Sequence, residues 1–537
     1  MCELSLRRFW SATRTGVLLL ASIGLLGTGG CNPSTESPGA RSSSGSTTTA
    51  ASDASEPDGH GAEYGKSEKV DPVAANGPIF EGWPKPRLAI VVTGQQQGYL
   101  EPCGCAGLEN QLGGLSRRHG MFEQLVENGW PVLGVDVGGQ VRRFGRQQEI
   151  KFQATVEALK TMKYAGVALG EADLRLPAEE LVAVVADAED APSPFVAANV
   201  ALFGFDAKLT KRFRIVEDAG IKVGITAVLG DEARTGLDAA QVENKPAAEG
   251  LREIMPELVD QSDFRILLAH ATREESLALA KEFSEFDLVV TSGGADVPPD
   301  RPTLVDDDTW LVEVGHKGMY AAVIGLFDES EPPRYQRVPL DTRFKPSDEM
   351  HQLLVNYQDH LRELGWAGLG LTPAAHPRTR SNNPLSGQFA SAESCAECHT
   401  KAHAIWSKSA HAHATDTLAK LDPPRQFDPE CISCHATGWN AQDYFPYTSG
   451  FDGMETTPLL AGNSCENCHG PGAAHVAAEK AKGAERNLAL RDSLRTEMRL
   501  TKATAAEHVC GTCHDIDNSP NFKFEVYWPK VEHKGKD

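Results

Sequence analysis

The stretch SCENCHGPGAAH, residues 464–475, contains the pattern C-x-x-C-H, which also occurs at 395–399, 431–435 and 510–514. These four copies hold eight of the 12 cysteines in the 537-residue chain. A single copy can arise by chance or belong to a zinc or thiol redox site, whereas four copies point to one repeated chemistry. The position of the cysteines is therefore more informative than their number.

The spacing of this motif matches the covalent attachment of haem. Two thiols three positions apart span the two vinyl groups of one haem as thioethers, and the adjacent histidine reaches the iron. We therefore predict four covalently attached haem c groups. The predicted attachment cysteines are Cys395, Cys398, Cys431, Cys434, Cys465, Cys468, Cys510 and Cys513. The predicted proximal iron ligands are His399, His435, His469 and His514.

Residues 389–537 form the segment that would enclose these four haems. So few residues for each macrocycle imply that the porphyrins make up much of the core and nearly touch. Neighbouring irons at that spacing exchange electrons rapidly. We therefore predict a small, mainly α-helical multihaem cytochrome c domain that transfers electrons.

This segment resembles the tetrahaem cytochrome c-554/c-prime family, in FASAESCAECH, CISCHATGW, SCENCHGPGAAH and CGTCHD. In that family, the histidine in the contexts S-x-H-A, C-H-G-P-G-x-x-H and W-P-K-x-x-H is a distal ligand to a haem other than its own. The resemblance implies that the distal iron ligands are His411, His475 and His533. It also implies one five-coordinate iron, although His403, His413 and His508 remain alternative occupants of that position.

Residues 80–345 alternate strand-like apolar runs with helical patterns. Leu88–Val92, Phe264–Leu268 and Leu288–Val290 are such runs, and Arg273–Phe283 is a helical pattern between the last two. This alternation predicts an α/β layered domain with its chemistry in the loops after the strands. The chain as a whole is therefore predicted to be multidomain.

The order of these segments resembles the metallophosphoesterase domain of secreted 5'-nucleotidases, on LAIVVTG, VLGVDVGG, VALGEAD and LLAHATREESLALAKEF. A two-metal phosphoesterase needs carboxylate, histidine and asparagine ligands around both ions. The motif positions instead hold Gln95-Gln96-Gln97, Gly138-Gly139, Gly170-Glu171-Ala172-Asp173 and Gly294-Ala295-Asp296-Val297. His270 is the one clear ligand retained. Asp136, Glu171 and Asp173 are better explained as caps or loop groups than as substitute ligands, so we predict a catalytically silent domain.

Two more cysteines, Cys103 and Cys105, form C-G-C in a glycine-rich loop. A strained redox-active disulfide, a thiolate pair for a soft metal and a structural pair in a tight turn remain alternatives. Residues 346–388 join the two domains through an amphipathic helix, Met350–Trp366, and a polar stretch with prolines.

The beginning of the chain predicts export. Arginines precede an apolar run, Gly16–Leu26, and small residues lead to Cys31, so residues 1–31 are predicted to be a signal peptide. The surroundings of Cys31 resemble a lipoprotein lipidation site, with an ordinary secretory cleavage as the alternative. Residues 32–78 are predicted to be a disordered tether, because they lack large apolar side chains. We expect a periplasmic or outer-envelope protein, anchored to the membrane through Cys31.

The formal net charge of −22 disfavours nucleic acid as a partner, because binding to phosphates needs a basic face. Haem propionates would add negative charge, so we expect a redox partner with a basic docking patch. The main functional hypothesis is an exported electron-transfer cytochrome. One alternative is a redox enzyme for a small nitrogen species, such as nitric oxide or hydroxylamine, at a five-coordinate haem. Another is a metal-dependent phosphoesterase with a haem domain.

Overall fold

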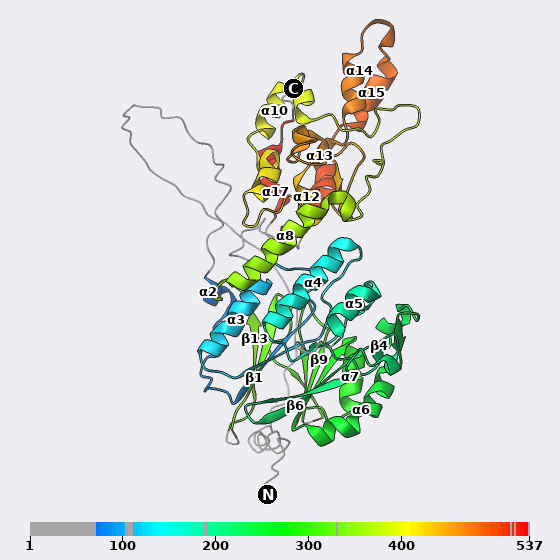
Figure 1. Ribbon diagram of the computed structural model, residues 1–537. Coiled ribbons are helices and arrows are strands. Elements are labelled where there is room, and N and C mark those ends of the chain that lie inside the picture. Colours follow the sequence, from blue (N-terminus) through cyan, green and yellow to red (C-terminus); the bar gives the residue numbers. More distant parts are fainter. Residues whose placement is uncertain are drawn as a thin grey trace, which may run out of the picture.

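The computed structural model describes residues 71–102, 111–186, 192–306, 308–328, 331–515, 518–519 and 522–534. The predicted leader with Cys31, most of the predicted tether, and Cys103 and Cys105 lie outside the described residues. Figure 1 shows two parts of the chain joined by the long helix α8, Asp348–Gly368. None of the helices in the described ranges is both long and apolar enough to cross a membrane.

The first sheet of the N-terminal part has the strand order β13-β12-β1-β2-β3. Its strands are β1 (Leu88–Thr93), β2 (Val132–Asp136), β3 (Gly166–Val167), β12 (Tyr320–Leu326) and β13 (Arg334–Pro339). The central strand β1 pairs parallel to β2 and antiparallel to β12. Every residue of β1 is buried, as expected for a strand covered on both faces.

The second sheet has the strand order β10-β11-β9-β8-β6-β5. Its strands are β5 (Phe213–Asp218), β6 (Ile221–Leu229), β8 (Phe264–His270), β9 (Leu288–Thr291), β10 (Thr303–Val305) and β11 (Thr309–Glu313). A short separate ladder pairs β4 (Val200–Leu202) with β7 (Val242–Asn244). Strands β6, β8, β9 and β11 are mutually parallel. Helical crossovers join β6 to β8 and β8 to β9, whereas β9 reaches β11 through strand β10.

The two sheets pack face to face and carry helices on their outer faces. Alternate residues of β1 show this arrangement, because Ile90 packs into a core shared with Ile225 of β6, whereas Val91 packs toward the helices. The helices are α2 (Pro72–Asn76), α3 (Leu115–Glu127), α4 (Arg146–Thr161), α5 (Ala178–Val185), α6 (Ala247–Gln261) and α7 (Arg273–Glu282). The predicted α/β layered domain is confirmed.

Helix α8 belongs to the surface of this domain and leads to the C-terminal part. Ser347 caps its start by accepting a hydrogen bond from the Met350 amide at 3.2 Å. Leu354 and Leu361 are buried against the core of the first sheet. At the far end, the ring of Trp366 meets that of Trp439 edge to face at 5.0 Å between centroids. The helix expected in the joint is therefore also a packing element for both parts.

The C-terminal part consists of short helices and loops. The helices are α9 (Ala392–Ala396), α10 (Thr400–Trp406), α11 (Ala414–Ala419), α12 (Pro429–His435), α13 (Cys465–His469), α14 (Ala473–Lys480), α15 (Leu488–Glu497), α16 (Lys502–Thr504) and α17 (Phe524–Val531). One hairpin pairs β14 (Trp439–Asn440) with β15 (Phe445–Pro446). A small apolar cluster around Ile432, Trp439 and Phe451 is the side-chain core described there. Helices α14 and α15 form a hairpin that projects from the rest (Figure 1).

Candidate haem sites

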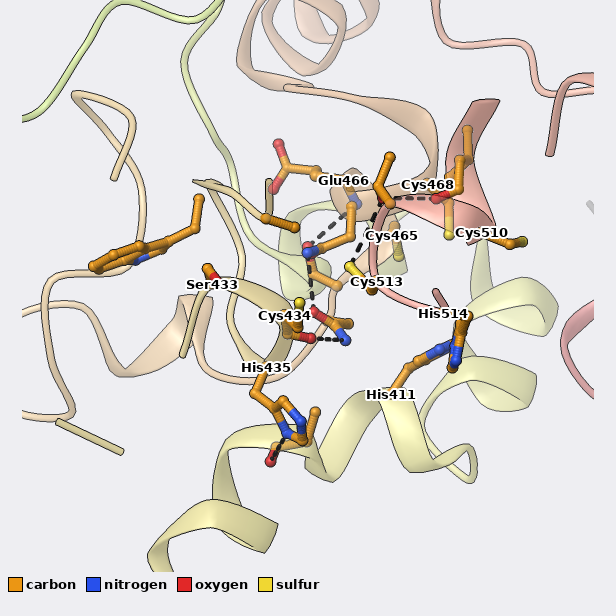
Figure 2. A pocket seen from close by; sticks show the side chains of 18 of the residues that line it. His411, Ser433, Cys434, His435, Cys465, Glu466, Cys468, Cys510, Cys513 and His514 are labelled. Carbon is orange, nitrogen blue, oxygen red and sulfur yellow. Dashed lines mark hydrogen bonds between the residues drawn. The ribbon is translucent and has the colours of Figure 1, made fainter. Parts of the chain in front are cut away.

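A cavity of about 2790 Å³ runs through the C-terminal part. Both cysteines and the histidine of all four C-x-x-C-H motifs line it. Figure 2 shows motif side chains from separate segments directed into the same space, among them Cys434, Cys468 and Cys513. A large cavity beside a small side-chain core is the arrangement that bulky prosthetic groups need, and its thiols and imidazoles fit the chemistry of covalent haem.

Local sequence explains how the motifs form single helical turns. Asp428 caps α12 by accepting a hydrogen bond from the Glu430 amide at 2.9 Å, and Pro429 stands in the first turn. Ser464 caps α13 in the same way, through the Glu466 amide at 3.2 Å. Because residues at i, i+3 and i+4 share one helix face, each turn presents two thiols and one imidazole together.

Three of the predicted proximal histidines have their Nδ1 atoms bonded to the protein. His435 Nδ1 lies 2.9 Å from the Ala414 carbonyl oxygen, His469 Nδ1 lies 2.8 Å from that of Met498, and His514 Nδ1 lies 3.1 Å from Ser519 Oγ. A carbonyl accepts but cannot donate, so in His435 and His469 the proton is on Nδ1 and the lone pair is on Nε2, the atom that can bind a metal.

These imidazoles are also neutral. Burial lowers the pKa of His435 and of His469, and burial together with the neighbouring His411 lowers the pKa of His514 to about 4. A neutral imidazole is the form that binds a metal. The protonation state therefore favours iron ligation.

Two of the predicted distal histidines pair with proximal ones. The ring centroids of His411 and His514 are 6.1 Å apart, and those of His469 and His533 are 5.9 Å apart. An iron between two imidazole nitrogens sets ring centres roughly 6 Å apart, since each metal–nitrogen bond is about 2 Å long. His411 and His514 lie side by side in Figure 2. The structure thus brings His411 to the fourth motif and His533 to the third.

The third predicted distal ligand, His475 of α14, lies near the first motif. Burial lowers its pKa, and the influence of His399 on that pKa places the two rings within electrostatic range. His475 Nδ1 is buried without a hydrogen-bond partner and lies 3.9 Å from Glu479 Oε1. An orphaned nitrogen of this kind in the cavity wall fits a metal ligand.

The three alternative histidines are placed differently. His413 is 58% exposed and its Nε2 lies 3.2 Å from the Ser407 carbonyl oxygen. His508 is 65% exposed and its Nε2 lies 3.6 Å from Glu507 Oε2. His403 packs its ring against Trp406, with 5.1 Å between centroids. Exposure sets His413 and His508 apart from the half-buried and buried rings that form the pairs.

Thiol contacts give the spatial order of the four motifs. Cys395 and Cys465 are hydrogen-bonded, which joins the first motif to the third. Cys434 and Cys513 are hydrogen-bonded, which joins the second to the fourth. The third motif and the fourth are linked because Cys510 raises the pKa of Cys468 electrostatically, after burial. By these thiol contacts alone the order is first, third, fourth, second. The second motif also touches the third, because Asn467 Nδ2 donates to the Ala436 carbonyl oxygen at 3.0 Å.

Glu466 is a residue that the sequence analysis did not single out. It stands between the cysteines of the third motif, is 2% exposed, and accepts hydrogen bonds from the amides of Ala390, Ser391 and Gly472. These contacts tie the segment before the first motif to the third motif. An acidic residue inside a C-x-x-C-H turn is a signal that could have been noticed.

The replaced ligand positions of the N-terminal domain are filled by the protein itself. Asp136 is fully buried and accepts hydrogen bonds from Thr93 Oγ1 at 2.6 Å and Gln140 Nε2 at 2.7 Å. The guanidinium of Arg118, also fully buried, lies 3.6 Å from the same carboxylate and donates to Gln96. The guanidinium therefore already neutralises the Asp136 carboxylate. A carboxylate that served as a metal ligand would instead be neutralised by the metal ion.

Asp173 is likewise saturated by the backbone. It accepts from the amides of Gly139, Val141 and Gly170 at 2.8 to 3.1 Å. Glu171 points instead to Arg175, with which it forms a partly exposed ion pair. These contacts agree with the expectation of caps and loop groups.

The retained histidine, His270, directs Nδ1 to the Val137 carbonyl oxygen at 3.0 Å. Within the ranges that the structure describes, the one cluster of three metal-type side chains with ligand atoms inside 4.8 Å is His119, Glu123 and Glu349, which lies elsewhere and is largely exposed. His270 therefore has no set of metal ligands gathered around it in those ranges.

Comparison with known proteins supports the resemblance of the C-terminal segment. Residues 394–470 match the family model "Cytochrome c554 and c-prime". Over 118 residues the chain is 32% identical to cytochrome c-554 of Nitrosomonas europaea, a match that covers 19% of this chain and 48% of that protein. The chain thus spans about half the length of the curated relative that it matches. It carries a cytochrome c554 family domain at its C-terminal end.

Solved structures similar to the N-terminal part are phosphoesterases. The 5'-nucleotidase precursor from Thermus thermophilus has a TM-score of 0.45 and 19% identity, over 52% of this chain and 59% of that one. A calcineurin-like phosphoesterase from Bacillus subtilis has a TM-score of 0.40 and 18% identity, over 52% of this chain and all of that one. The α/β assignment itself rests on the two-sheet topology described above.

Proposed function

We propose that this protein is an exported tetrahaem c-type cytochrome that transfers electrons in the cell envelope. The observation that carries the proposal is the convergence of four complete C-x-x-C-H motifs on one cavity, with histidine pairs about 6 Å apart at two of them. The family domain at residues 394–470 supports covalent haem c, and the four motifs support a count of four.

The residues have separable roles in this proposal. The eight motif cysteines would form the thioethers, and His399, His435, His469 and His514 would be the proximal ligands. His411, His475 and His533 would be distal ligands. Haem c, when bound, supplies reversible one-electron storage and rapid exchange between neighbouring groups. The thiol contacts support a chain of sites in the order first, third, fourth, second.

The N-terminal domain is proposed to be catalytically silent. The supporting observation is that Asp136 and Asp173 are saturated by an arginine, side-chain donors and backbone amides. The proposal includes export and lipid anchoring through Cys31. The signal-like leader predicts export, and an exported protein is one to which haem c can be attached. A soluble or membrane redox partner with a basic patch would match the acidic chain.

A second candidate function is redox chemistry on a small nitrogen species at an open iron. It is favoured by the histidine positions, because three distal candidates are available for four motifs and two of the three alternatives, His413 and His508, are exposed. The third, His403, has a buried Nε2 without a hydrogen-bond partner among the described residues and is the residue that would close the open iron. Nitric oxide added to the ferric protein would then abolish the high-spin electron paramagnetic resonance signal, because a ferric nitrosyl haem is diamagnetic. A spectrum unchanged by nitric oxide would reject this candidate.

The proposed function is tested on the mature protein expressed with a haem c maturation system. We expect four haems per chain from the pyridine haemochrome and from the intact mass, and full reoxidation of the reduced protein by a soluble one-electron acceptor. The same preparation should hydrolyse no nucleotide or phosphate ester with added Mn²⁺ or Zn²⁺. Fewer than four covalent haems, or metal-dependent hydrolysis abolished by His270→Ala, would contradict the proposal.

A further inference from the structure

The two domains meet at the helix that carries the second motif. Asp428, the cap of α12, accepts hydrogen bonds from Gln147 Nε2 of α4 at 2.8 Å and from the Tyr357 hydroxyl of α8 at 3.2 Å. Both Asp428 and Tyr357 are buried. The N-terminal domain therefore holds the start of α12 directly, three residues before Cys431.

An ion pair crosses this boundary beside the motif. Lys151 Nζ of α4 donates to Glu430 Oε2 at 2.6 Å, and Gln148 Nε2 donates to Glu430 Oε1 at 2.9 Å. The lysine side chain is 7% exposed and that of Glu430 is 28% exposed. Glu430 immediately precedes Cys431, whose thiol is within electrostatic range of Lys151. Both charged groups line the haem cavity.

The loop that carries the replaced phosphoesterase ligands holds Lys151 in place. After Gln95, Gln96 and Gln97 it continues through residues 98–101, which form part of the cavity wall. A Cβ added at Gly98 would lie 3.3 Å from Lys151 Cδ, and Gly98 has a φ of +78° that disfavours other residues. The loop is therefore packed closely against the lysine stem.

Both members of the pair are ionised at neutral pH. Burial disfavours the ammonium, but the carboxylates of Glu430 and Asp428 hold the pKa of Lys151 above its usual value. Burial opposes the carboxylate of Glu430, but Lys151 lowers the pKa of Glu430. Two opposite charges thus stand at fixed positions next to Cys431, in surroundings where charges are poorly screened.

We propose that Lys151, from the N-terminal domain, compensates the charge of Glu430 and thereby keeps the haem attached at Cys431 and Cys434 at its reduction potential. The inference rests on the proposed function, because it requires haem at the second motif. A nearby positive charge stabilises the reduced state and a negative charge stabilises the oxidised state. The N-terminal domain would thus influence the potential of the haem at the second motif.

The test is a redox titration of the holoprotein and three variants, followed optically and by electron paramagnetic resonance. Lys151→Met should lower the potential of one haem, because it leaves Glu430 uncompensated, and Glu430→Gln should raise it. We expect about a tenfold change in the ratio of reduced to oxidised haem at a fixed poise, equivalent to about 59 mV for one electron. The double variant should return close to wild type.

Lys160→Met is the matched control, since Lys160 lies in the last turn of the same helix, away from Glu430. It should leave all potentials unchanged. Unshifted potentials in both single variants, or shifts of the same sign, would overturn the inference while four attached haems left the proposed function intact. Loss of one haem in the double variant would also overturn it, because the pair would then be needed for attachment rather than potential. Absence of haem from the wild type would instead refute the proposed function.

Discussion

The two domains both bury polar groups, but they satisfy the hydrogen bonding of those groups differently. In the N-terminal domain the carboxylates of Asp136 and Asp173 are bonded inward, to an arginine, side-chain donors and backbone amides. In the C-terminal domain backbone carbonyls accept hydrogen bonds from Nδ1 of His435 and His469, which leaves the lone pair of each ring on Nε2, and both rings line a large cavity. A buried polar group whose hydrogen bonds are all made within the protein has none left for a cofactor. This property, more than the type of residue, distinguishes the two domains.

The strongest test of this difference is to remove one pair of thiols. Replacing Cys465 and Cys468 together by alanine should lower the haem count from four to three and destabilise the C-terminal domain, because the cavity would lose a large part of its filling. Haem content and circular dichroism measure both effects. Glu397→Gln, an exposed change inside the first motif, should keep four haems. An unchanged haem count in the double cysteine variant would contradict the account.

The next effect concerns a single iron ligand. His533→Ala should convert one low-spin ferric haem to high spin without loss of attachment, since the His533 ring faces His469 at 5.9 Å. Electron paramagnetic resonance reports the change. His413→Ala serves as the control and should leave the spectrum as in wild type, because His413 is exposed. A low-spin spectrum in both variants would remove His533 from the ligand set.

On the N-terminal side, Asp173→Asn should reduce the free energy of unfolding of that domain by about 1–3 kcal/mol, because an amide cannot accept from all three backbone donors. Denaturant unfolding of the variant, followed by tryptophan fluorescence, measures the loss. The exposed Glu171→Gln should change stability by less than about 0.5 kcal/mol. Added Mn²⁺ should stabilise neither wild type nor variant, and a metal-dependent rise in stability would indicate a site after all.

The smallest expected effect is on pH dependence. Burial lowers the pKa of His376 to about 4, against an ordinary value of 6.5, so the unfolded chain binds more protons between these pH values. The stability that the folded protein gains with His376 neutral is therefore complete above about pH 6.5. It is lost as the pH falls toward 4, because the unfolded chain takes up the proton first. His376→Phe should flatten that slope by up to one proton, measured by denaturant unfolding at several pH values. An equal slope in the two proteins would exclude this role.

The sequence was sufficient for the features that depend on local pattern. The four copies of one cysteine–histidine spacing predicted the haem motifs. The alternating apolar runs predicted the layered α/β domain, because the periodicity of strands and helices is visible in residues close together in the sequence. The positions that the phosphoesterase resemblance aligns with metal ligands hold Gln95, Gly139 and Ala172, which can likewise be read along the chain.

Features that join distant segments were not predictable in the same way. The pairing of His411 with His514 and of His469 with His533 depends on how short helices fold around the cavity. Two ion pairs likewise join residues far apart in sequence: Arg118 with Asp136, and Lys151 with Glu430. Such contacts are set by tertiary packing, and no single-residue pattern marks them.

The most direct test of the central claim is an integrated electron paramagnetic resonance spectrum of the fully oxidised, full-length protein. The account predicts ferric signals that sum to four haems per chain, with low-spin bis-histidine signals from the third and fourth motifs at least. A sum below four, or a spectrum that is entirely high spin, would contradict the assignment of paired histidines to a four-haem cavity.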